Sequence, residues 1–159
     1  MSSELTRLLP AELEQYMHRK IPLSAAMAVA VVSVGDSAVT LAAPLAPNIN
    51  HRETVFGGSV CAVAILASWS LLYVRLRAAG LTASLVIQRN SMEYQQPITG
   101  QFTARASLEH PERWPSFTTM LARKGKARVS VAAVLEHAHQ VAGTFSGEFV
   151  ALAAQPGTQ

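Results

Sequence analysis

The segment from residue 54 to residue 74 contains no charged side chain, and it constrains the fold more than any other part of the chain. Its length approaches that of a membrane span. However, it includes three serines and the pair Gly57-Gly58, and strand-like segments flank it on both sides. A helix that is apolar all round is equally typical of the centre of a soluble fold. We therefore predict a buried central helix from about Gly57 to Ala79, capped at its C-terminus by Gly80.

The segments on either side of this helix favour β-strands. A valine-rich run at 26–34 and an apolar run at 37–43 are separated by Gly35-Asp36, which suits a tight hairpin turn. After the helix we expect a short helix that ends at Gly125 and four further strands, near 83–95, 101–109, 126–136 and 141–150.

The N-terminal part of the chain is expected to be helical. Its apolar residues recur at three- and four-residue steps, at Leu5, Leu8, Leu9, Leu13, Tyr16 and Met17. Pro10 is tolerated in a first turn, so this helix is broken or restarted there and ends near Lys20. An antiparallel sheet wrapped around one apolar helix would explain why the central helix has no polar face. The sequence therefore predicts an α+β hotdog fold.

The composition agrees with one packed domain over residues 1–159, with a core at about 5–150. Half of the 159 residues are hydrophobic and only 14% are charged. So little charge suggests that part of the surface is covered by a partner subunit. Open sheet edges are also commonly paired between chains. We therefore expect a homodimer or a dimer of dimers.

Charge and cysteine content exclude several classes of function. The net charge of +3 is mild and is not gathered into long runs, which argues against nucleic acid as a partner. It suits an anionic small partner or an acidic carrier protein. The only cysteine, Cys61, excludes an internal disulfide and has no metal-ligand spacing around it, so we predict no metal site and a packing role. Residues 1–7 lack a secretory signal pattern, which favours a cytoplasmic protein.

The start of the central helix is the best candidate for chemistry. A helix that begins with Gly57-Gly58 presents unobstructed backbone N–H groups at the positive end of its dipole. Such a site can hold a thioester carbonyl and stabilise the negative charge that builds on its oxygen. Asn50, in the preceding loop, can add a side-chain amide donor. The glycines could instead merely allow helix and sheet to pack, and composition does not distinguish these two interpretations.

Two motifs carry a resemblance to known enzymes. The loop from Asn50 to Gly58 resembles the N-x-x-G-T-x-H-G-G motif of hotdog thioesterases of the phenylacetate-pathway type, with the spacing of Asn50, Thr54 and the glycine pair kept. The T-x-F-G-G-S run that follows Glu53, together with Trp69 and the later 125–128 segment, Gly-Lys-Ala-Arg, resembles a putative thioesterase family more closely.

That family also occurs as the C-terminal part of acetyltransferase-fused proteins, and the resemblance spans about residues 5–150. It implies a hotdog fold and activity on an acyl group carried by coenzyme A or acyl carrier protein. It implies no cofactor beyond the coenzyme A or phosphopantetheine that belongs to the substrate.

The chain departs from the better-known thioesterases at two positions, and one of them removes the acid that hydrolysis requires. Phe56 stands where the better-known thioesterases have histidine, and Ile65 stands where they have a catalytic aspartate within the helix. Thioester hydrolysis usually needs a carboxylate to activate water or attack the carbonyl. Glu53 is the only acid close in sequence. It either serves as that carboxylate, as a loop acid does in another hotdog branch, or is an exposed charge paired with Arg52.

The remaining candidates each have two interpretations. His51 is either a general base or substrate-orienting group, or an exposed loop residue without a role. Ser59 caps the helix or lines the pocket rather than acting as a nucleophile, because no base is placed to activate it. Trp69 packs in the core or shapes an acyl pocket. The candidates for substrate binding also include Thr54 and Phe56. A further candidate is a basic cluster that either is a solvated turn or binds a nucleotide phosphate or an acidic carrier helix. Its members are Arg123, Lys124, Lys126 and Arg128.

The sequence therefore leaves three functions open. Hydrolysis agrees with the family label. Decarboxylation of a malonyl thioester, which members of the resembled family are associated with, needs a stabilised enolate oxygen and a desolvated carboxylate but no water-activating base. Asn50 and the glycine amides would supply the first requirement, and Phe56 with the apolar helix the second. A non-catalytic acyl-thioester binding module is the third.

Overall fold

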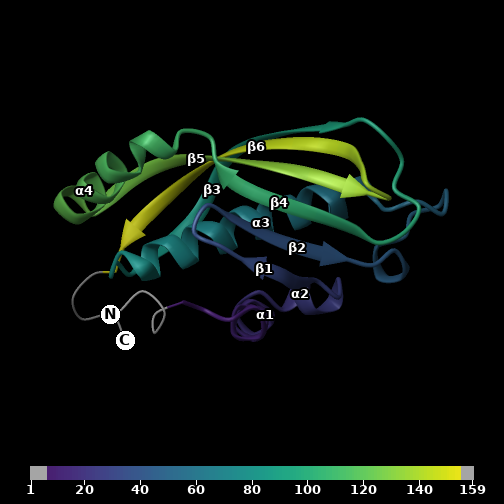
Figure 1. Cartoon of the computed structure of the whole chain (residues 1–159), viewed down its shortest axis with the longest axis horizontal. Coiled ribbons are helices and arrows are strands. Elements are labelled where there is room, and N and C mark those ends of the chain that lie inside the picture. Colours follow the sequence, from purple (N-terminus) through teal and green to yellow (C-terminus); the bar gives the residue numbers. More distant parts are fainter. Residues whose placement is uncertain (1–6, 155–159) are drawn as a thin grey trace.

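The computed structural model describes residues 7–154, so Leu5 of the N-terminal apolar pattern lies outside the described residues. Its elements, in chain order, are α1 (Pro10–Lys20), α2 (Pro22–Ala26), β1 (Ala30–Val34), β2 (Ala38–Ala43), the 3-10 turn η1 (Ala46–Asn48), α3 (Gly57–Ala78), β3 (Ala83–Tyr94), β4 (Phe102–Leu108), the 3-10 turn η2 (Pro111–Arg113), α4 (Trp114–Lys124), β5 (Lys126–His137) and β6 (Gln140–Ala153) (Figure 1).

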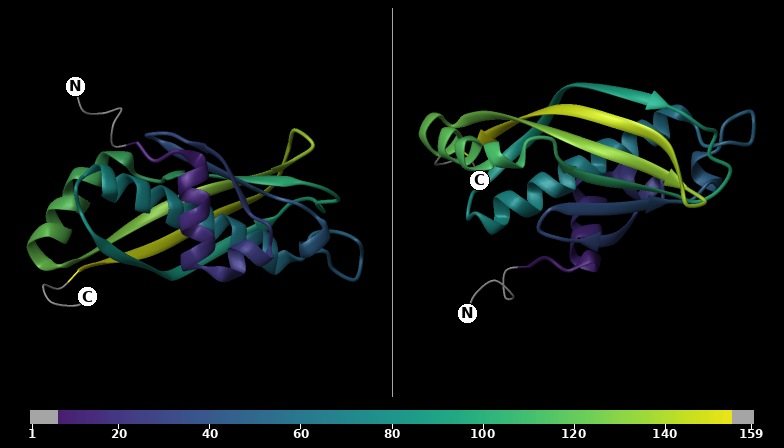
Figure 2. Two further views of the ribbon diagram at one scale, coloured as in Figure 1. Left: turned by 90° about the horizontal axis from the view of Figure 1, so that it is seen from below. Right: turned by 45° about the horizontal axis from the view of Figure 1, so that its top comes forward.

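The strands form one antiparallel sheet in the order β1-β2-β4-β5-β6-β3. β3 follows α3 in sequence but pairs with β6 along its whole length, so β1 and β3 are the two edges. The sheet curves around α3 (Figures 1 and 2). This is the α+β hotdog architecture that the sequence predicts.

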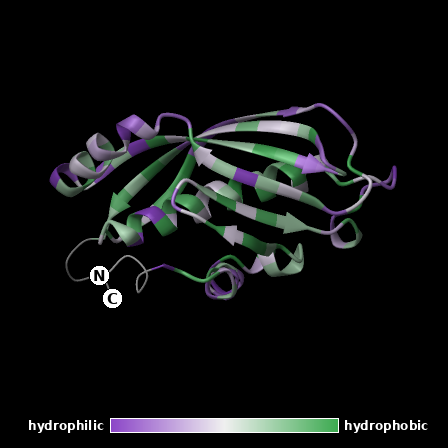
Figure 3. Ribbon diagram, viewed as in Figure 1, coloured by the Kyte–Doolittle hydropathy of each residue, from purple (hydrophilic) through white to green (hydrophobic). Residues whose placement is uncertain are grey.

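The helix α3 fills the core of the sheet. Val63, Ala67 and Leu71 lie one turn apart on it and are fully buried. They belong to one hydrophobic cluster with the inward side chains of the strands, including Leu41 and Phe102. By length and composition α3 could also cross a membrane. Packing inside the sheet explains instead why its apolar residues extend all round it (Figure 3).

The prediction of a strand over 26–34 is wrong for its first half. Pro22 opens the short helix α2, where a missing N–H costs nothing. Ser24 stabilises this turn, because its Oγ donates a hydrogen bond to the carbonyl oxygen of Ile21 at 2.6 Å. Ala28, with a φ of 57°, then reverses the chain before β1 begins at Ala30. The apolar pattern here reflects packing against the core and not strand pairing.

The predicted turns and helix ends agree with the structure. The β1–β2 hairpin is closed by a hydrogen bond from the Gly35 N–H to the carbonyl of Ala38, over 2.9 Å. Gly80 and Gly125 follow α3 and α4 with φ values of 72° and 73°. Only glycine adopts this left-handed conformation without strain, which is why both helices end there.

Candidate functional site

Asn50 organises the loop that precedes α3. Its Oδ1 accepts hydrogen bonds from the backbone N–H of Arg52 at 2.8 Å and of Thr54 at 3.1 Å. Its Nδ2 donates to the Thr54 Oγ1 at 2.9 Å, which leaves one N–H of the amide outside these bonds. The motif thus spaces Asn50 and Thr54 so that the hydrogen bonds between them close this loop.

Glu53 occupies a strained position in the same loop. Its φ is 63°, in the left-handed region that favours glycine. The hotdog motif N-x-x-G-T has its glycine at this place, so the backbone of the loop keeps the conformation although the side chain differs. Glu53 and His51 are both exposed. The structure records no salt bridge between Glu53 and Arg52.

Asn48 anchors the other side of the loop. It is buried, and its Nδ2 donates hydrogen bonds to the carbonyl oxygens of Met27 and Pro44, each at 2.9 Å. The backbone carbonyl oxygen of Asn48 accepts a hydrogen bond from the backbone N–H of Phe56 at 2.7 Å. Asn48 therefore fixes the point where α3 begins. The sequence pattern does not reveal Asn48, because a buried asparagine in a loop cannot be told from an exposed one by pattern.

The start of α3 carries two unpaired backbone amides. No side chain caps the helix, and the N–H groups of Ser59 and Val60 both donate to the carbonyl of Phe56, at 2.9 and 3.1 Å. The N–H groups of Gly57 and Gly58 make no hydrogen bond within residues 7–154. The Ser59 hydroxyl is not recorded in a hydrogen bond either. These two amides lie at the positive end of the helix dipole, where a negative oxygen is stabilised.

The packing of this chain does not itself require both glycines. Neither has a positive φ. A Cβ at Gly57 would meet the ring of Tyr94 at 3.4 Å, which is an ordinary contact. A Cβ at Gly58 would collide with the Phe56 ring, but Phe56 is 57% exposed and free to move. Without side chains at these two positions the backbone N–H groups are unshielded, so a ligand group can approach them closely.

Tyr94 is the functional candidate that sequence analysis missed. It is the last residue of β3, and its hydroxyl donates a hydrogen bond to the carbonyl oxygen of Gly57 at 3.0 Å. Burial raises the pKa of this phenol, with a smaller contribution from Cys61. Tyr94 also lines a small cavity of about 270 Å³ with Val55 and Val60, which flank the helix start.

Cys61 lies one turn further along α3. Its Sγ donates to the Oδ1 of Asn90 on β3 at 3.5 Å. Burial raises the pKa of this thiol, so it stays protonated and is a poor nucleophile near neutral pH.

An apolar groove runs along α3 beyond these residues. Its volume is about 480 Å³, and Ala62, Ile65 and Trp69 line it from α3, with Leu85 and Ile87 facing them from β3. Ile65, the position of the aspartate in the better-known thioesterases, thus faces an apolar space.

Trp69 is half-buried beside this groove and belongs to an aromatic stack. Its ring lies parallel to that of Tyr73, with centroids 5.5 Å apart, and Tyr73 stacks on Tyr16 at 4.6 Å. Through Tyr16, α1 packs on a side of α3 that the sheet leaves uncovered (Figure 2).

The basic cluster does not lie beside the glycine amides. Lys124 ends α4, and Lys126 and Arg128 begin β5. This part of the chain packs on the C-terminal end of α3, where the Arg75 guanidinium lies 4.5 Å from the centre of the Trp114 ring. A helix of 22 residues is about 33 Å long, so the length of α3 separates the cluster from Gly57 within one chain (Figure 1).

Comparison with known proteins identifies relatives over nearly the whole chain. The family model described as "Putative thioesterase (yiiD_Cterm)" matches residues 10–153. A crystal structure of a protein of unknown function from Chlorobaculum tepidum TLS is 27% identical with a TM-score of 0.85, covering 91% of this chain and 94% of that one.

Two solved structures are described as thioesterases. One, called a putative thioesterase, comes from Shewanella oneidensis; it is 26% identical with a TM-score of 0.79, covering 90% of this chain and 96% of that one. The other comes from Haemophilus influenzae and is 10% identical with a TM-score of 0.77, covering 96% of each chain. At that identity it shows the fold alone.

Proposed function

The chain belongs to the putative thioesterase family, and from this premise we propose that it hydrolyses acyl thioesters carried by coenzyme A or acyl carrier protein at the start of α3. The observation that carries the proposal is the pair of unpaired amides at Gly57 and Gly58. An acyl thioester presents one carbonyl oxygen, and that oxygen becomes negative when water adds to the carbonyl carbon. Preorganised N–H donors stabilise such an oxygen more strongly in the transition state than in the substrate.

The other residues of the site have supporting roles in this proposal. Asn50 keeps the loop closed and leaves one N–H for the same oxygen. Tyr94 holds the first residue of α3 through the Gly57 carbonyl. The Phe56 ring lies beside Gly58 and shields the amides in part, and the acyl chain lies in the apolar groove beside Ile65 and Trp69. The attacking water is activated by Glu53 or His51, both of which are exposed in the loop.

A second reaction is favoured by one specific observation: α3 contains no carboxylate, and the groove side of its second and third turns is apolar. Decarboxylation of a malonyl thioester needs no base to activate water. The bond between the α-carbon and the carboxylate breaks, carbon dioxide leaves, and the electron pair forms an enolate whose oxygen the Gly57 and Gly58 amides stabilise. Protonation of the α-carbon by water then gives the acetyl thioester.

The proposed assembly is a homodimer or a dimer of dimers. β3 is a strand of 12 residues with one unpaired edge, and Val86 on it is 50% exposed. An open edge of this length is usually protected by pairing. A second copy of the chain that added its own β3 would continue the sheet and cover the groove between α3 and β3.

One experiment distinguishes the reactions. The protein is incubated with malonyl and medium-chain thioesters of both coenzyme A and acyl carrier protein, and the products are identified by mass. Free thiol with the free acid indicates hydrolysis, and acetyl thioester with carbon dioxide indicates decarboxylation. Stable binding of these thioesters without any product would contradict both reactions and support the non-catalytic binding module.

A further inference from the structure

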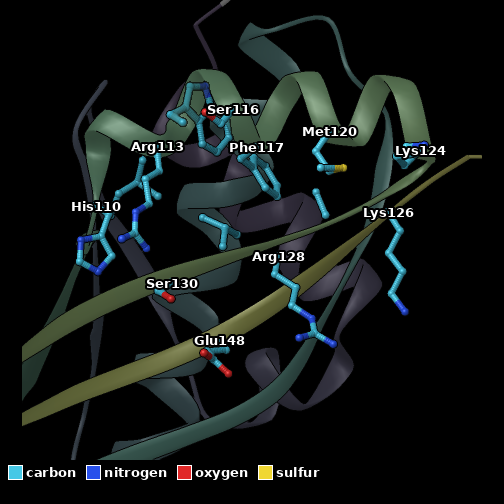
Figure 4. A pocket seen from close by; sticks show the side chains of 14 residues that line it. His110, Arg113, Ser116, Phe117, Met120, Lys124, Lys126, Arg128, Ser130 and Glu148 are labelled. Atoms are coloured by element: carbon cyan, nitrogen blue, oxygen red, sulfur yellow. The ribbon is translucent and has the colours of Figure 1, made fainter.

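A large cavity lies between α4 and the first half of β5. Its volume is about 980 Å³, which is within the range of small-molecule sites. Leu108, Phe117 and Val129 give it an apolar wall. Figure 4 shows Phe117 and Met120 projecting from α4 toward β5. Because it lies at the C-terminal end of α3, the cavity is separate from the site at Gly57 and Gly58 of the same chain.

The polar lining of the cavity is strongly basic. Its cations are contributed by η2, α4 and β5 and are Arg113, Lys124, Lys126 and Arg128, with His110 beside them. Figure 4 shows Arg113 and His110 at one end and Lys124 and Lys126 at the other. None of the four cations makes an ion pair in the described part of the chain. The one carboxylate in the lining, Glu148, forms a salt bridge with Arg89 at 3.3 Å. Uncompensated cations around a concave surface produce a positive potential that attracts anions.

The backbone of β5 adds directed donors. β4 ends at Leu108, whereas β5 extends beyond it toward α4. The carbonyl of Ser130 accepts the Glu109 N–H, on the β4 side of the strand, whereas the carbonyl of Gly125 accepts the Ala153 N–H on the β6 side. Backbone groups alternate along an antiparallel strand, so the N–H groups of Lys126 and Arg128 point to the β4 side, where no strand pairs with them. They therefore lie on the side of β5 where Leu108, at the end of β4, also lines the cavity.

We propose that this cavity binds a small polyanion with two or more phosphate groups, such as a nucleoside diphosphate. The cations surround the space from three elements, which fits several phosphate oxygens better than a single charge. The exposed Met120 and the Phe117 ring offer an apolar surface to the base or sugar. The inference goes beyond the proposed function, because it requires no turnover of a thioester.

The test is titration calorimetry at low salt with pyrophosphate, ADP, 3′-phospho-ADP and neutral adenosine. We expect the three phosphorylated compounds to bind, adenosine not to bind, and the affinity to fall as sodium chloride is raised. Tighter binding of 3′-phospho-ADP than of ADP would identify the nucleotide end of coenzyme A as the source of the phosphates. Equal binding of ADP and pyrophosphate would identify a general polyphosphate site. Absence of binding by all three would overturn the inference.

A double variant with a matched control checks where binding occurs. Replacing Lys126 and Arg128 together by glutamine should weaken ADP binding by about tenfold or more, because at least one charge-assisted contact is lost. Both side chains are exposed, so the fold should persist. The matched control is Arg105→Gln, an exposed arginine on β4 that does not line the cavity. ADP binding that is unchanged in the double variant would overturn the location. Thioester turnover is measured separately, so failure of the proposed function and failure of this inference give different results.

Discussion

The hydroxyl of Tyr94 donates a hydrogen bond to the carbonyl oxygen of Gly57 over 3.0 Å. This contact joins the end of β3, an edge strand, to the first residue of α3. It fixes the Gly57–Gly58 peptide group, which carries the unpaired Gly58 N–H, and it leaves both unpaired N–H groups free. The position of the proposed oxyanion site thus depends on a strand that follows the helix in sequence.

Replacing Tyr94 by phenylalanine should lower turnover more than stability. The ring contact with Gly57 remains, and a single hydrogen bond at a half-exposed side chain contributes about 1 kcal/mol or less to stability. We expect kcat to fall about three- to tenfold while the unfolding midpoint in urea changes little. A large loss of stability with normal kcat would show that Tyr94 has only a structural role.

The ionisation of Tyr94 gives an independent check on the same contact. Its pKa is raised by burial, and the neutral phenol is the form that donates to Gly57. The contribution to stability is therefore present below the ordinary tyrosine pKa of about 10 and is lost as pH rises through the higher value in the folded protein. In a phenolate absorbance titration, the tyrosine that Tyr94→Phe removes should ionise above pH 10. Ionisation at or below about pH 10 would contradict this.

Asn50→Asp and Asn50→Ala separate the two possible roles of Asn50. Aspartate keeps the acceptor oxygen for the N–H groups of Arg52 and Thr54 but has no amide donor. Alanine loses both. If Asn50 donates to the substrate oxygen, both variants should lose about two to three orders of magnitude in kcat, as expected for loss of an oxyanion donor. Activity retained in Asn50→Asp but lost in Asn50→Ala would assign Asn50 to the loop alone.

Much of the fold could be predicted from the sequence because its strongest signals are local. The uncharged run at 54–74 marks the central helix, and Gly80 and Gly125 mark helix ends that need a positive φ. The error at 26–34 arose because Met27 and Val29 are buried by packing next to α2, and a strand would bury the same residues.

The candidate site was predictable only where its residues are close in sequence. The loop from Asn50 to Gly58 is one continuous segment, and the structure keeps it together. Tyr94 comes from a strand 37 residues after Gly57, so no local pattern connects them. The basic cluster, grouped with the loop as substrate-binding, lies at the other end of α3 because strand order decides where α4 packs.

Glu53→Gly should stabilise the protein. A left-handed backbone conformation costs an ordinary residue roughly 1–2 kcal/mol, whereas glycine adopts it freely. Part of this gain is offset by the greater freedom of glycine in the unfolded chain, so we expect about 1 kcal/mol in urea denaturation. Stability that is unchanged or reduced would contradict the strain assigned to this position.

The same substitution tests Glu53 as the hydrolytic acid, with Glu53→Gln as the companion variant that keeps the side-chain length. Loss of hydrolysis in both variants would identify Glu53 as the group that activates water. Decarboxylation of a malonyl thioester should be unaffected by both, since that reaction needs no such group.

Ala62→Phe should shorten the acyl chains that the protein accepts. Ala62 lines the groove between α3 and β3, and a phenyl ring there would occupy part of its 480 Å³. We expect kcat/KM for decanoyl thioesters to fall at least about tenfold relative to acetyl thioesters, because burial of each methylene contributes about 0.8 kcal/mol. An equal effect on both substrates would place the acyl chain elsewhere.

The central claim is that the free N–H at the start of α3 stabilises the substrate oxygen, and Gly57→Pro tests it most directly. Proline suits the first position of a helix, and Phe56, with φ of −57° and ψ of 130°, has the conformation that a following proline requires. The substitution removes one N–H that makes no hydrogen bond in the protein. Gly57→Ala is the control, because it keeps the N–H and adds a Cβ that only contacts Tyr94. We predict that Gly57→Pro has a thermal midpoint at least equal to that of Gly57→Ala. Its kcat on acyl or malonyl thioesters should be about a hundredfold lower than that of Gly57→Ala. A well-folded Gly57→Pro protein with the kcat of the alanine variant would contradict the account.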